Sequence, residues 1–142
     1  MPLAAADFYR GAALSQIIGH PAFETIKPLG KGRYLVNGGI LVWLRHSKEK
    51  SPWNFAFNSQ ELTALGEDLK ADGKVFLCLV CRRDNICALD GAEIAQALKL
   101  DQATEQTLTV TRVPGRKSGV SGPGGEVEGV ILASAFPDKV FS

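Results

Sequence analysis

The sequence predicts a single α+β domain in which a central mixed β-sheet is flanked by about three helices. Segments with helical spacing of apolar residues alternate with short strand-like runs, and the most apolar run, 75–81, lies between two helical segments. At 142 residues, the chain should bury roughly 68% of its unfolded surface, which is enough for one core. We therefore expect residues 1–142 to form one globular domain.

The composition argues against several classes of protein. Hydrophobic residues make up 45% of the chain and the formal net charge is +1, which excludes a disordered chain. No apolar run approaches the ~18 residues of a membrane span, so we expect no membrane partner. The small net charge is also unlike the basic excess of a strongly electrostatic nucleic-acid binder.

The N-terminal part is expected to contain a helix, a bent strand and a hairpin. Apolar residues recur at helical spacing over 7–19, with Asp7 as the N-cap. Proline and glycine within 25–36 predict a bent strand. Asn37 and Gly38 lie between two apolar runs and indicate a hairpin turn, because both residues tolerate a positive φ.

The middle of the chain is expected to supply a half-buried strand, a helix and the central strand. Aromatic residues alternate from Trp53 to Phe57, which is typical of a strand with one buried face. Ser59 is expected to cap a helix over 60–71. The run 75–81 is apolar on both faces, which predicts a strand that is covered on both sides.

The C-terminal part is expected to add strands, a short helix and a flexible loop. The stretch 114–125 contains two prolines and, beyond Gly115, four more glycines, which predicts a flexible loop. The expected order is a strand over 86–89, a helix over 92–98 capped by Asp90, a strand over 107–113, the glycine-rich loop over 114–125 and a last strand over 127–133.

The three cysteines favour buried, reduced thiols. Cys78 and Cys81 form a C-x-x-C spacing, but residues three apart on a strand point to opposite faces. A redox pair needs a helix N-terminus and a zinc site needs a second pair of ligands. With Cys87 as an odd third thiol and no secretory signal, we expect core packing and a cytoplasmic protein.

Motifs for the common catalytic chemistries fit turns better than active sites. His20 precedes Pro21 at the end of a helix, where a capping role suits it. Ser121 lies in a glycine-flanked tract, but Pro123 breaks the nucleophile-elbow pattern. The glycines around Lys31 precede a strand and not the helix of a phosphate loop. The predicted strands carry almost no acids, so we expect neither a metal nor a cofactor.

Basic residues in two stretches are the candidate binding site for nucleic acid or another anion. Cations beside the aromatic side chains of Trp53 and Phe55 would suit a nucleic-acid surface. Glu49 interrupts the first stretch, and an ordinary solvated surface is the alternative. The candidate residues are Arg45, His46, Lys48, Arg112, Arg116 and Lys117.

The order of elements expected over 34–81 resembles the core of the restriction-endonuclease-like, or PD-(D/E)XK, fold. In that family a helix leads into a hairpin, which is followed by a strand, a helix and a buried strand. An acid near the hairpin turn and an acid-x-Lys on the next strand hold Mg²⁺. At these positions the chain has Asn37 and the tripeptide from Trp43 to Arg45. The resemblance therefore implies a copy of the nuclease core without its acidic metal ligands.

Three hypotheses for the function follow. The leading one is a non-enzymatic binding or interaction module that contacts nucleic acid or another protein. The second is an active metal-dependent nuclease whose acids come from elsewhere, such as Glu24, Glu61 or Asp84. The third is a structural subunit of a homo-oligomer that pairs through an exposed strand edge. The tract 51–55 together with 79–81 also resembles small bacterial proteins, which implies no particular activity.

Overall fold

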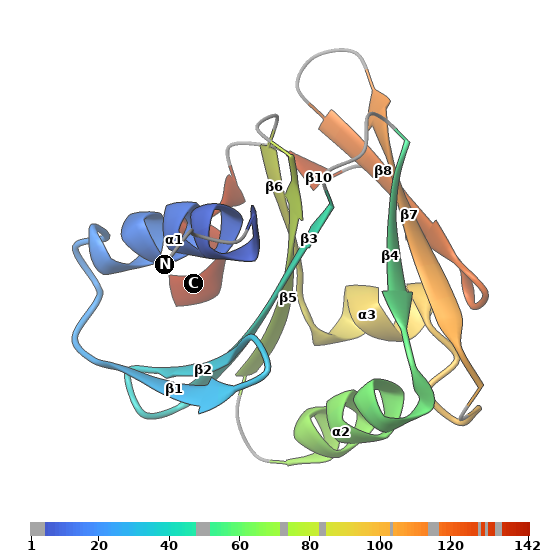
Figure 1. The fold of residues 1–142 in the computed structure, drawn as a ribbon, viewed down its shortest axis with the longest axis horizontal. Helices are drawn as coiled ribbons and strands as arrows, with labels where there is room; N and C mark the ends of the chain where they lie inside the picture. The colour runs from blue at the N-terminus through green and yellow to red at the C-terminus, as the bar shows by residue number, and fades with distance from the viewer. Residues whose placement is uncertain are drawn as a thin grey trace.

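The chain has three helices and two β-sheets in the part that the computed structural model describes, which confirms the α+β class with a mixed sheet (Figure 1). The described residues are 5–47, 52–71, 74–82, 85–102, 104–113, 117–127, 129, 131–132 and 135–142. The helices are α1 (Ala5–Ile18), α2 (Ser59–Lys70) and α3 (Gly91–Ala97), and a 3₁₀ turn (Asp138–Phe141) ends the chain.

The larger sheet combines one parallel pair with antiparallel neighbours. Its order is β1 (Ile26–Gly30), β2 (Arg33–Val36), β3 (Ile40–Ser47), β5 (Lys74–Cys81) and β6 (Asn85–Leu89), with β3 parallel to β5. The smaller sheet has the order β10 (Ile131–Leu132), β8 (Lys117–Gly122), β7 (Gln106–Val113) and β4 (Trp53–Phe57), and β9 (Gly125–Glu126) pairs with β8.

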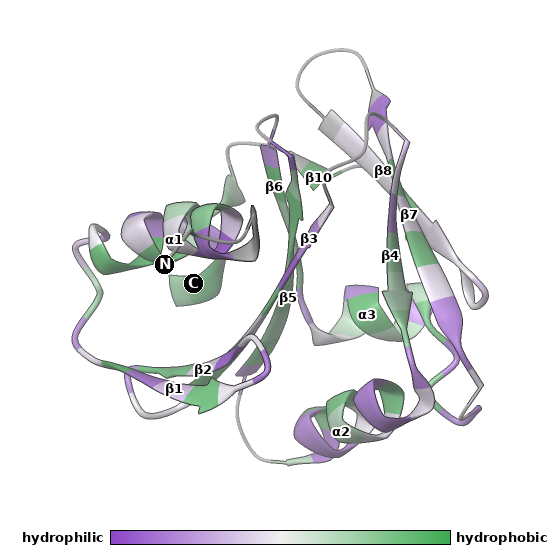
Figure 2. Ribbon diagram, viewed as in Figure 1, coloured by the Kyte–Doolittle hydropathy of each residue, from purple (hydrophilic) through white to green (hydrophobic). Residues whose placement is uncertain are grey.

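The larger sheet is the central layer of the molecule. One of its faces packs against α1 and the C-terminal turn, while the other faces α2, α3 and the smaller sheet (Figure 1). Apolar residues are frequent along its strands (Figure 2) and contribute to a core cluster on each face. The run that forms β5 is buried from Val75 to Cys81 because both faces are covered, as its continuous apolar pattern predicts.

The thiols occupy both sides of the central layer. Cys78 packs in the core beneath α1, and Cys81 and Cys87 pack in the core between the sheets, which confirms the expected opposite faces. Burial raises the pKa of Cys87 to about 12. Burial also raises the pKa of Cys78, and the neighbouring Cys87 adds to that shift. Cys78 and Cys87 are therefore neutral core side chains near neutral pH.

The predicted hairpin and helix caps follow from local side-chain hydrogen bonds. Asn37 has a φ of 52° at the β2–β3 turn, and its Oδ1 accepts the backbone N–H of Glu24 at 2.7 Å. Asp90 caps α3 as expected, in a reciprocal capping box with Glu93. The cap of α2 is Asn58 and not Ser59, because the asparagine side chain reaches the backbone N–H three residues later.

The ends of two other elements differ from the prediction. Helix α1 already includes Ala5, so Asp7 lies in its first turn and is not the N-cap. The single bent strand over 25–36 is two antiparallel strands, because the positive φ values of Gly30 and Gly32 support a tight turn.

The glycine-rich loop over 114–125 is a correction to the expected fold. Residues 117–122 form β8, which pairs with both β7 and β10. A Cβ at Gly122 would collide with the carbonyl oxygen of Ala97, and Gly124 donates its N–H to that oxygen at 2.9 Å. The glycines at 122 and 124 therefore let the hairpin approach α3 closely.

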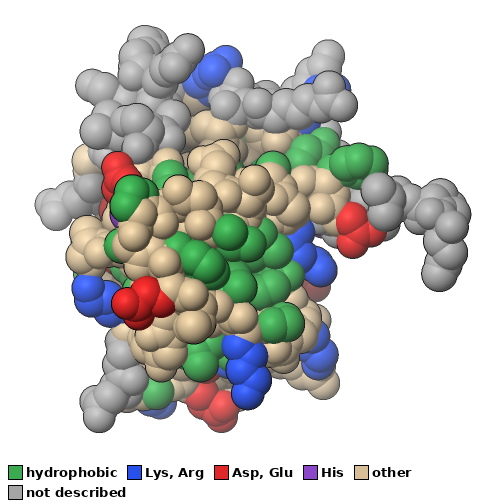
Figure 3. All heavy atoms as spheres, turned by 90° about the vertical axis from the view of Figure 1, so that its left-hand side faces the viewer, with side chains coloured by type: hydrophobic (Ala, Val, Ile, Leu, Met, Phe, Trp, Pro, Cys, Tyr) green, Lys and Arg blue, Asp and Glu red, His purple; other side chains and the backbone are tan. Residues whose placement is uncertain are grey.

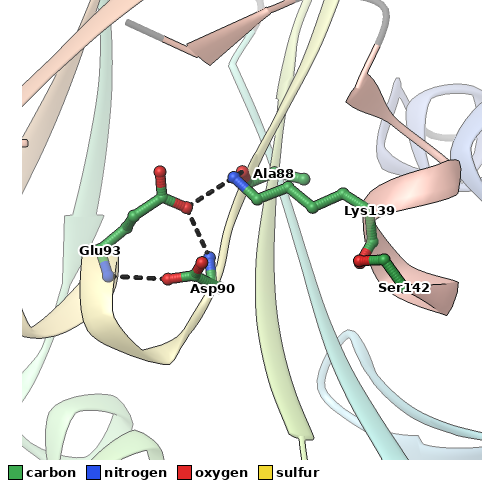
Figure 4. A network of polar contacts seen from close by, with 5 residues as sticks. All are labelled: Ala88, Asp90, Glu93, Lys139 and Ser142. Atoms are coloured by element: carbon green, nitrogen blue, oxygen red, sulfur yellow. Dashed lines mark hydrogen bonds and ion pairs between the residues drawn. The ribbon is translucent and has the colours of Figure 1, made fainter. Parts of the chain in front are cut away.

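Lys139 joins the C-terminal turn to α3 across the edge strand β6 (Figure 4). Its ammonium group lies 2.5 Å from Oε1 of Glu93 and donates to the carbonyl oxygen of Ala88 at 2.8 Å. The same Glu93 oxygen accepts the backbone N–H of Asp90 at 3.0 Å. This network fixes the last turn of the chain against the central sheet. No helix among the described residues has both the length and the apolar character needed to cross a membrane.

Candidate functional site

Strand ends from both sheets converge at one end of the molecule. In the larger sheet, Cys81 at the end of β5 lies beside Ser47 at the end of β3 and beside Asn85 at the start of β6. In the smaller sheet, Arg112 near the end of β7 pairs with Ser118 near the start of β8. All of these ends lie together at the top of Figure 1, beside the start of β4.

A direct hydrogen bond joins the two sheets at this end. Asn85 Nδ2 donates to Ser118 Oγ at 2.9 Å. The backbone N–H of Arg82 donates to the carbonyl oxygen of Ser47 at 2.9 Å, which joins the ends of β3 and β5. The strand ends therefore form one supported surface. We use the name strand-end rim for the sequence stretches that adjoin these strand ends, residues 48–52, 82–84 and 112–117, of which the structure describes 52, 82, 112, 113 and 117.

The sequence stretches of the strand-end rim carry an excess of positive charge. They hold seven lysines and arginines and two acids, a net charge of +5, whereas the rest of the chain holds nine and thirteen, a net charge of −4. The cations are Lys48, Lys50, Arg82, Arg83, Arg112, Arg116 and Lys117, and the acids are Glu49 and Asp84.

The structure describes only part of this rim. Arg82 and Arg112 are exposed. Lys48 and Arg116 lie outside the described residues, and only the backbone of Lys117 is described. Arg82 is not among the candidate residues, although the sequence places it with Arg83 among the basic residues directly after the central strand, and residues after neighbouring strands share one edge of a sheet.

Arg45 is engaged in the body of the molecule and not on the rim. It forms an ion pair with Glu61, donates to the carbonyl oxygen of Ala56 at 2.5 Å and lies over the ring of Phe57 at 4.8 Å. Glu61 is also the third residue of the α2 capping box. Arg45 therefore anchors the start of α2 to β3.

His46 lies on the opposite face of β3 from Arg45. Its ring stacks on Tyr9 of α1, with 5.4 Å between the ring centroids. Successive residues of a strand point to opposite faces. The structure consequently does not bring Arg45 and His46 together, although they are neighbours in sequence.

The positions that correspond to the nuclease motif carry structural contacts. The Asn37 side chain holds the segment before β1, as described above. Trp43 Nε1 donates to Asp68 Oδ2 at 2.9 Å, and Arg33 donates to both oxygens of that carboxylate at 2.8 and 2.9 Å. Sequence analysis missed this Arg33–Asp68–Trp43 cluster, which fastens α2 to the central sheet.

Two of the relocated acids of the nuclease hypothesis, Glu24 and Glu61, lie within the described residues. Glu61 is paired with Arg45, Glu24 is exposed before β1, and Asp84 lies outside the described residues. Among the described residues, no group of three or more histidine, cysteine, aspartate or glutamate side chains could hold a metal ion.

The features that bear on the oligomer hypothesis lie on the side of the molecule that carries α1 and β1. Strand β1 is an edge strand, but Pro28 and an irregular register after it reduce its capacity to pair with another chain. Figure 3, which faces this side, shows hydrophobic side chains gathered on the surface. Phe8 and Ile18 of α1 are exposed by 62% and 51%.

Comparisons of the chain with protein-family models, with curated proteins and with solved structures find no match. The resemblance to the nuclease core therefore remains a prediction.

Proposed function

We propose that the protein is a non-enzymatic binding module whose strand-end rim contacts the phosphate backbone of nucleic acid. The segregation of charge carries this proposal: the rim has a net charge of +5 and the remainder −4. A polyanion is attracted to one end of such a molecule and repelled by the rest, which orients its approach.

The hydrogen bonds that hold the strand ends together are suited to a binding surface. Connecting segments at the ends of packed strands are held by a rigid scaffold while their side chains face outward, and binding residues are often found in such places. The bond between Asn85 and Ser118 and the bond between Arg82 and Ser47 hold the two sheets and the two parallel strands together beneath the rim.

The nearby aromatic side chains do not supply a stacking platform. Trp53 and Phe55 are exposed by only 4% and 3%, and both pack between the sheets. Without base stacking, binding rests on contacts between cations and phosphates. Such binding is independent of sequence and weakens steeply as salt rises.

The test is the binding of a fluorescently labelled duplex and of a labelled single strand across a salt series. The double variant with Arg82→Glu and Arg112→Glu should bind at least about tenfold more weakly at low salt and show a shallower salt dependence. The matched control reverses the charges of Lys27 on β1 and Lys70 on α2, both of which are exposed and lie outside the rim. Equal losses in the two double variants, or affinity that does not change with salt, would contradict the proposal.

A further inference from the structure

One asparagine is chemically labile in its sequence context and is held firmly by the fold. Asn37 is the only asparagine of the chain that precedes a glycine. Because Gly38 has no side chain to hinder attack by its backbone nitrogen, this is the context in which an asparagine side chain most readily loses ammonia. The pair occupies the two central positions of the β2–β3 turn, which Gly39 closes by donating its N–H to the carbonyl oxygen of Val36 at 3.2 Å.

Three hydrogen bonds hold the Asn37 side chain against the segment that precedes β1. Its Oδ1 accepts the backbone N–H groups of Glu24 and Thr25 at 2.7 and 3.1 Å, and its Nδ2 donates to the carbonyl oxygen of Ala22 at 2.9 Å. A backbone N–H can only donate and a carbonyl oxygen can only accept, so these partners fix which atom of the amide is the oxygen. We call these three bonds the Asn37 clamp.

Deamidation of an asparagine passes through a cyclic imide. The Gly38 nitrogen bonds to Cγ of Asn37 while the bond between Cγ and Nδ2 breaks, and the leaving amide takes the proton of the Gly38 nitrogen and departs as ammonia. A water molecule then opens the ring at either carbonyl and yields aspartate or isoaspartate. The five-membered ring contains the Cα–C bond of Asn37, so closure requires the attacking nitrogen to lie on the same side of that bond as Cβ.

The folded backbone opposes this geometry. Asn37 has a φ of 52°, which lies in the left-handed region, where ψ is also positive and the next nitrogen points away from Cβ. Closure of the ring needs a negative ψ, and rotation to that value opens the turn and displaces the side chain from the clamp. The two N–H groups on Oδ1 polarise the amide carbonyl, but polarisation has no effect while the attacking nitrogen cannot reach Cγ.

We propose that Asn37 is a deamidation site that is closed in the folded protein and becomes reactive when segment 22–25 separates from the β2–β3 turn. This segment contains no helix or strand, so its contacts with Asn37 belong to the part of the fold that opens at low cost. Separation frees the side chain and the ψ of Asn37 together. The inference is independent of the proposed function, since the turn lies outside the strand-end rim.

The products of the reaction do not restore the clamp. An aspartate keeps acceptor oxygens for Glu24 and Thr25 but has no N–H for Ala22, so two acceptor oxygens face each other at that contact. An isoaspartate also adds a methylene group to the main chain within the two-residue turn, which moves Gly39 away from Val36. Deamidation therefore makes a transient opening of this segment permanent.

The measurement is the rate of deamidation at Asn37, followed by peptide mass spectrometry during incubation at mildly alkaline pH. The rate in the folded protein should be at least about tenfold lower than in the same chain unfolded by urea, because a tenfold difference requires only ~1.4 kcal/mol of opening free energy. Asn54, which precedes the bulky Phe55, should react slowly in both states and is the internal control. Equal rates at Asn37 in the two states would overturn the proposal.

Two substitutions at one exposed position test the clamp. Glu24→Pro removes the N–H that donates to Asn37 Oδ1, whereas Glu24→Ala keeps it. In the folded protein, Glu24→Pro should raise the rate of deamidation by about two- to tenfold, because the loss of one hydrogen bond shifts the opening equilibrium by that factor. Glu24→Ala should react at the parent rate. Equal rates in the two variants would show that the clamp does not protect Asn37 and would overturn the proposal.

Native-state hydrogen exchange of the parent protein supplies a readout that does not depend on the folding of the proline variant. The amide protons of Glu24, Thr25 and Gly39 should exchange through the same opening that exposes Asn37. Their slowing relative to the unfolded chain should therefore match the slowing of deamidation to within about threefold. Unprotected amides in a folded protein whose Asn37 stays unmodified would contradict the link between opening and reaction.

Discussion

The paired cations in the body of the molecule and the cations of the strand-end rim have different surroundings. Three of the ion pairs among the described residues join a lysine or arginine to a carboxylate on a helix that packs against the central sheet: Arg33 with Asp68 and Arg45 with Glu61 on α2, and Lys139 with Glu93 on α3. The rim instead gathers a surplus of positive charge where strands end.

Under the proposed function, the first group of charges positions helices and the second group contacts a partner. Glu61 and Glu93 each serve twice, because they complete a capping box and also receive a cation from a neighbouring element. A carboxylate near a helix N-terminus is stabilised by the helix dipole. Removing charge from the body should therefore lower stability, and removing it from the rim should lower affinity only.

The largest effect is expected in the core that supports both regions. Trp53→Ala removes a side chain that packs between the sheets and should lower the free energy of unfolding by ~3–5 kcal/mol. The measurement is urea denaturation followed by circular dichroism. Phe8→Ala, at an exposed site, is the control and should change stability by less than ~0.5 kcal/mol. A loss below about 1 kcal/mol for Trp53→Ala would refute its role in the core.

The next largest loss of stability is expected for a carboxylate in the body of the molecule. Asp68→Ala removes the acceptor for the Trp43 indole and for Arg33, and should cost ~2–3 kcal/mol because a shielded donor loses its partner. The control is Glu67→Ala, which alters the neighbouring exposed carboxylate on α2. Equal denaturation midpoints for the two variants would show that the Asp68 cluster does not stabilise the fold.

Opposite signs are expected for two glycine substitutions. Gly122→Ala places a methyl group against the backbone of α3 and should destabilise by ~1–3 kcal/mol through overpacking. Gly66→Ala lies in α2 with open space around the new Cβ, and should stabilise by ~0.5–1 kcal/mol. Thermal unfolding of both variants measures the difference. A neutral Gly122→Ala would restore the interpretation of this segment as a loose loop.

Alkaline pH should weaken the core through the thiols. Burial raises the pKa of Cys87 from 9.0 to about 12, so the folded state keeps a proton that the unfolded state releases. The protonated Cys87 thiol therefore contributes to the free energy of unfolding. This contribution is complete below about pH 9 and declines above it, by up to ~1.4 kcal/mol for one thiol between pH 9 and pH 10. The difference between the urea midpoints at pH 8 and pH 10 should be smaller for Cys87→Ala than for the parent protein. An unchanged pH dependence in the variant would contradict this assignment.

The smallest change in stability is expected on the rim. Arg82→Ala keeps a Cβ at a backbone position with a φ of 52°, so it removes charge without altering backbone strain. Its free energy of unfolding should stay within ~0.5 kcal/mol of the parent, while its affinity for a labelled duplex should fall. A loss of stability as large as that of Asp68→Ala would erase the distinction between the two regions.

Local signals predicted most of the elements. The hairpin turn at Asn37, the cap of α3 at Asp90 and the opposite faces of Cys78 and Cys81 all depend on residues within a few positions of one another. The cap of α2 was misplaced by one residue, since Asn58 and Ser59 both suit that role and only the geometry of the chain decides between them.

The second sheet was not predicted, because strand pairing over long sequence separations leaves little local trace. Trp53 pairs with Val110, although the alternation around Trp53 is equally compatible with a place in the central sheet. The same ambiguity affected residues 117–122, where glycines that fit closely against α3 resembled the glycines of a loop.

The amino-acid order by itself determined the α+β class, the buried central strand and the inert thiols, because periodicity, turn residues and the length of an apolar run act over short distances. The tertiary structure decided which cations act together. It placed Arg45 and His46 on opposite faces of β3 and gave both of them partners in the body. It also brought the C-terminal end of β5, which Arg82 follows, and that of β7, which carries Arg112, to one end of the molecule, because the register of strands distant in sequence determines which chain segments meet at an edge.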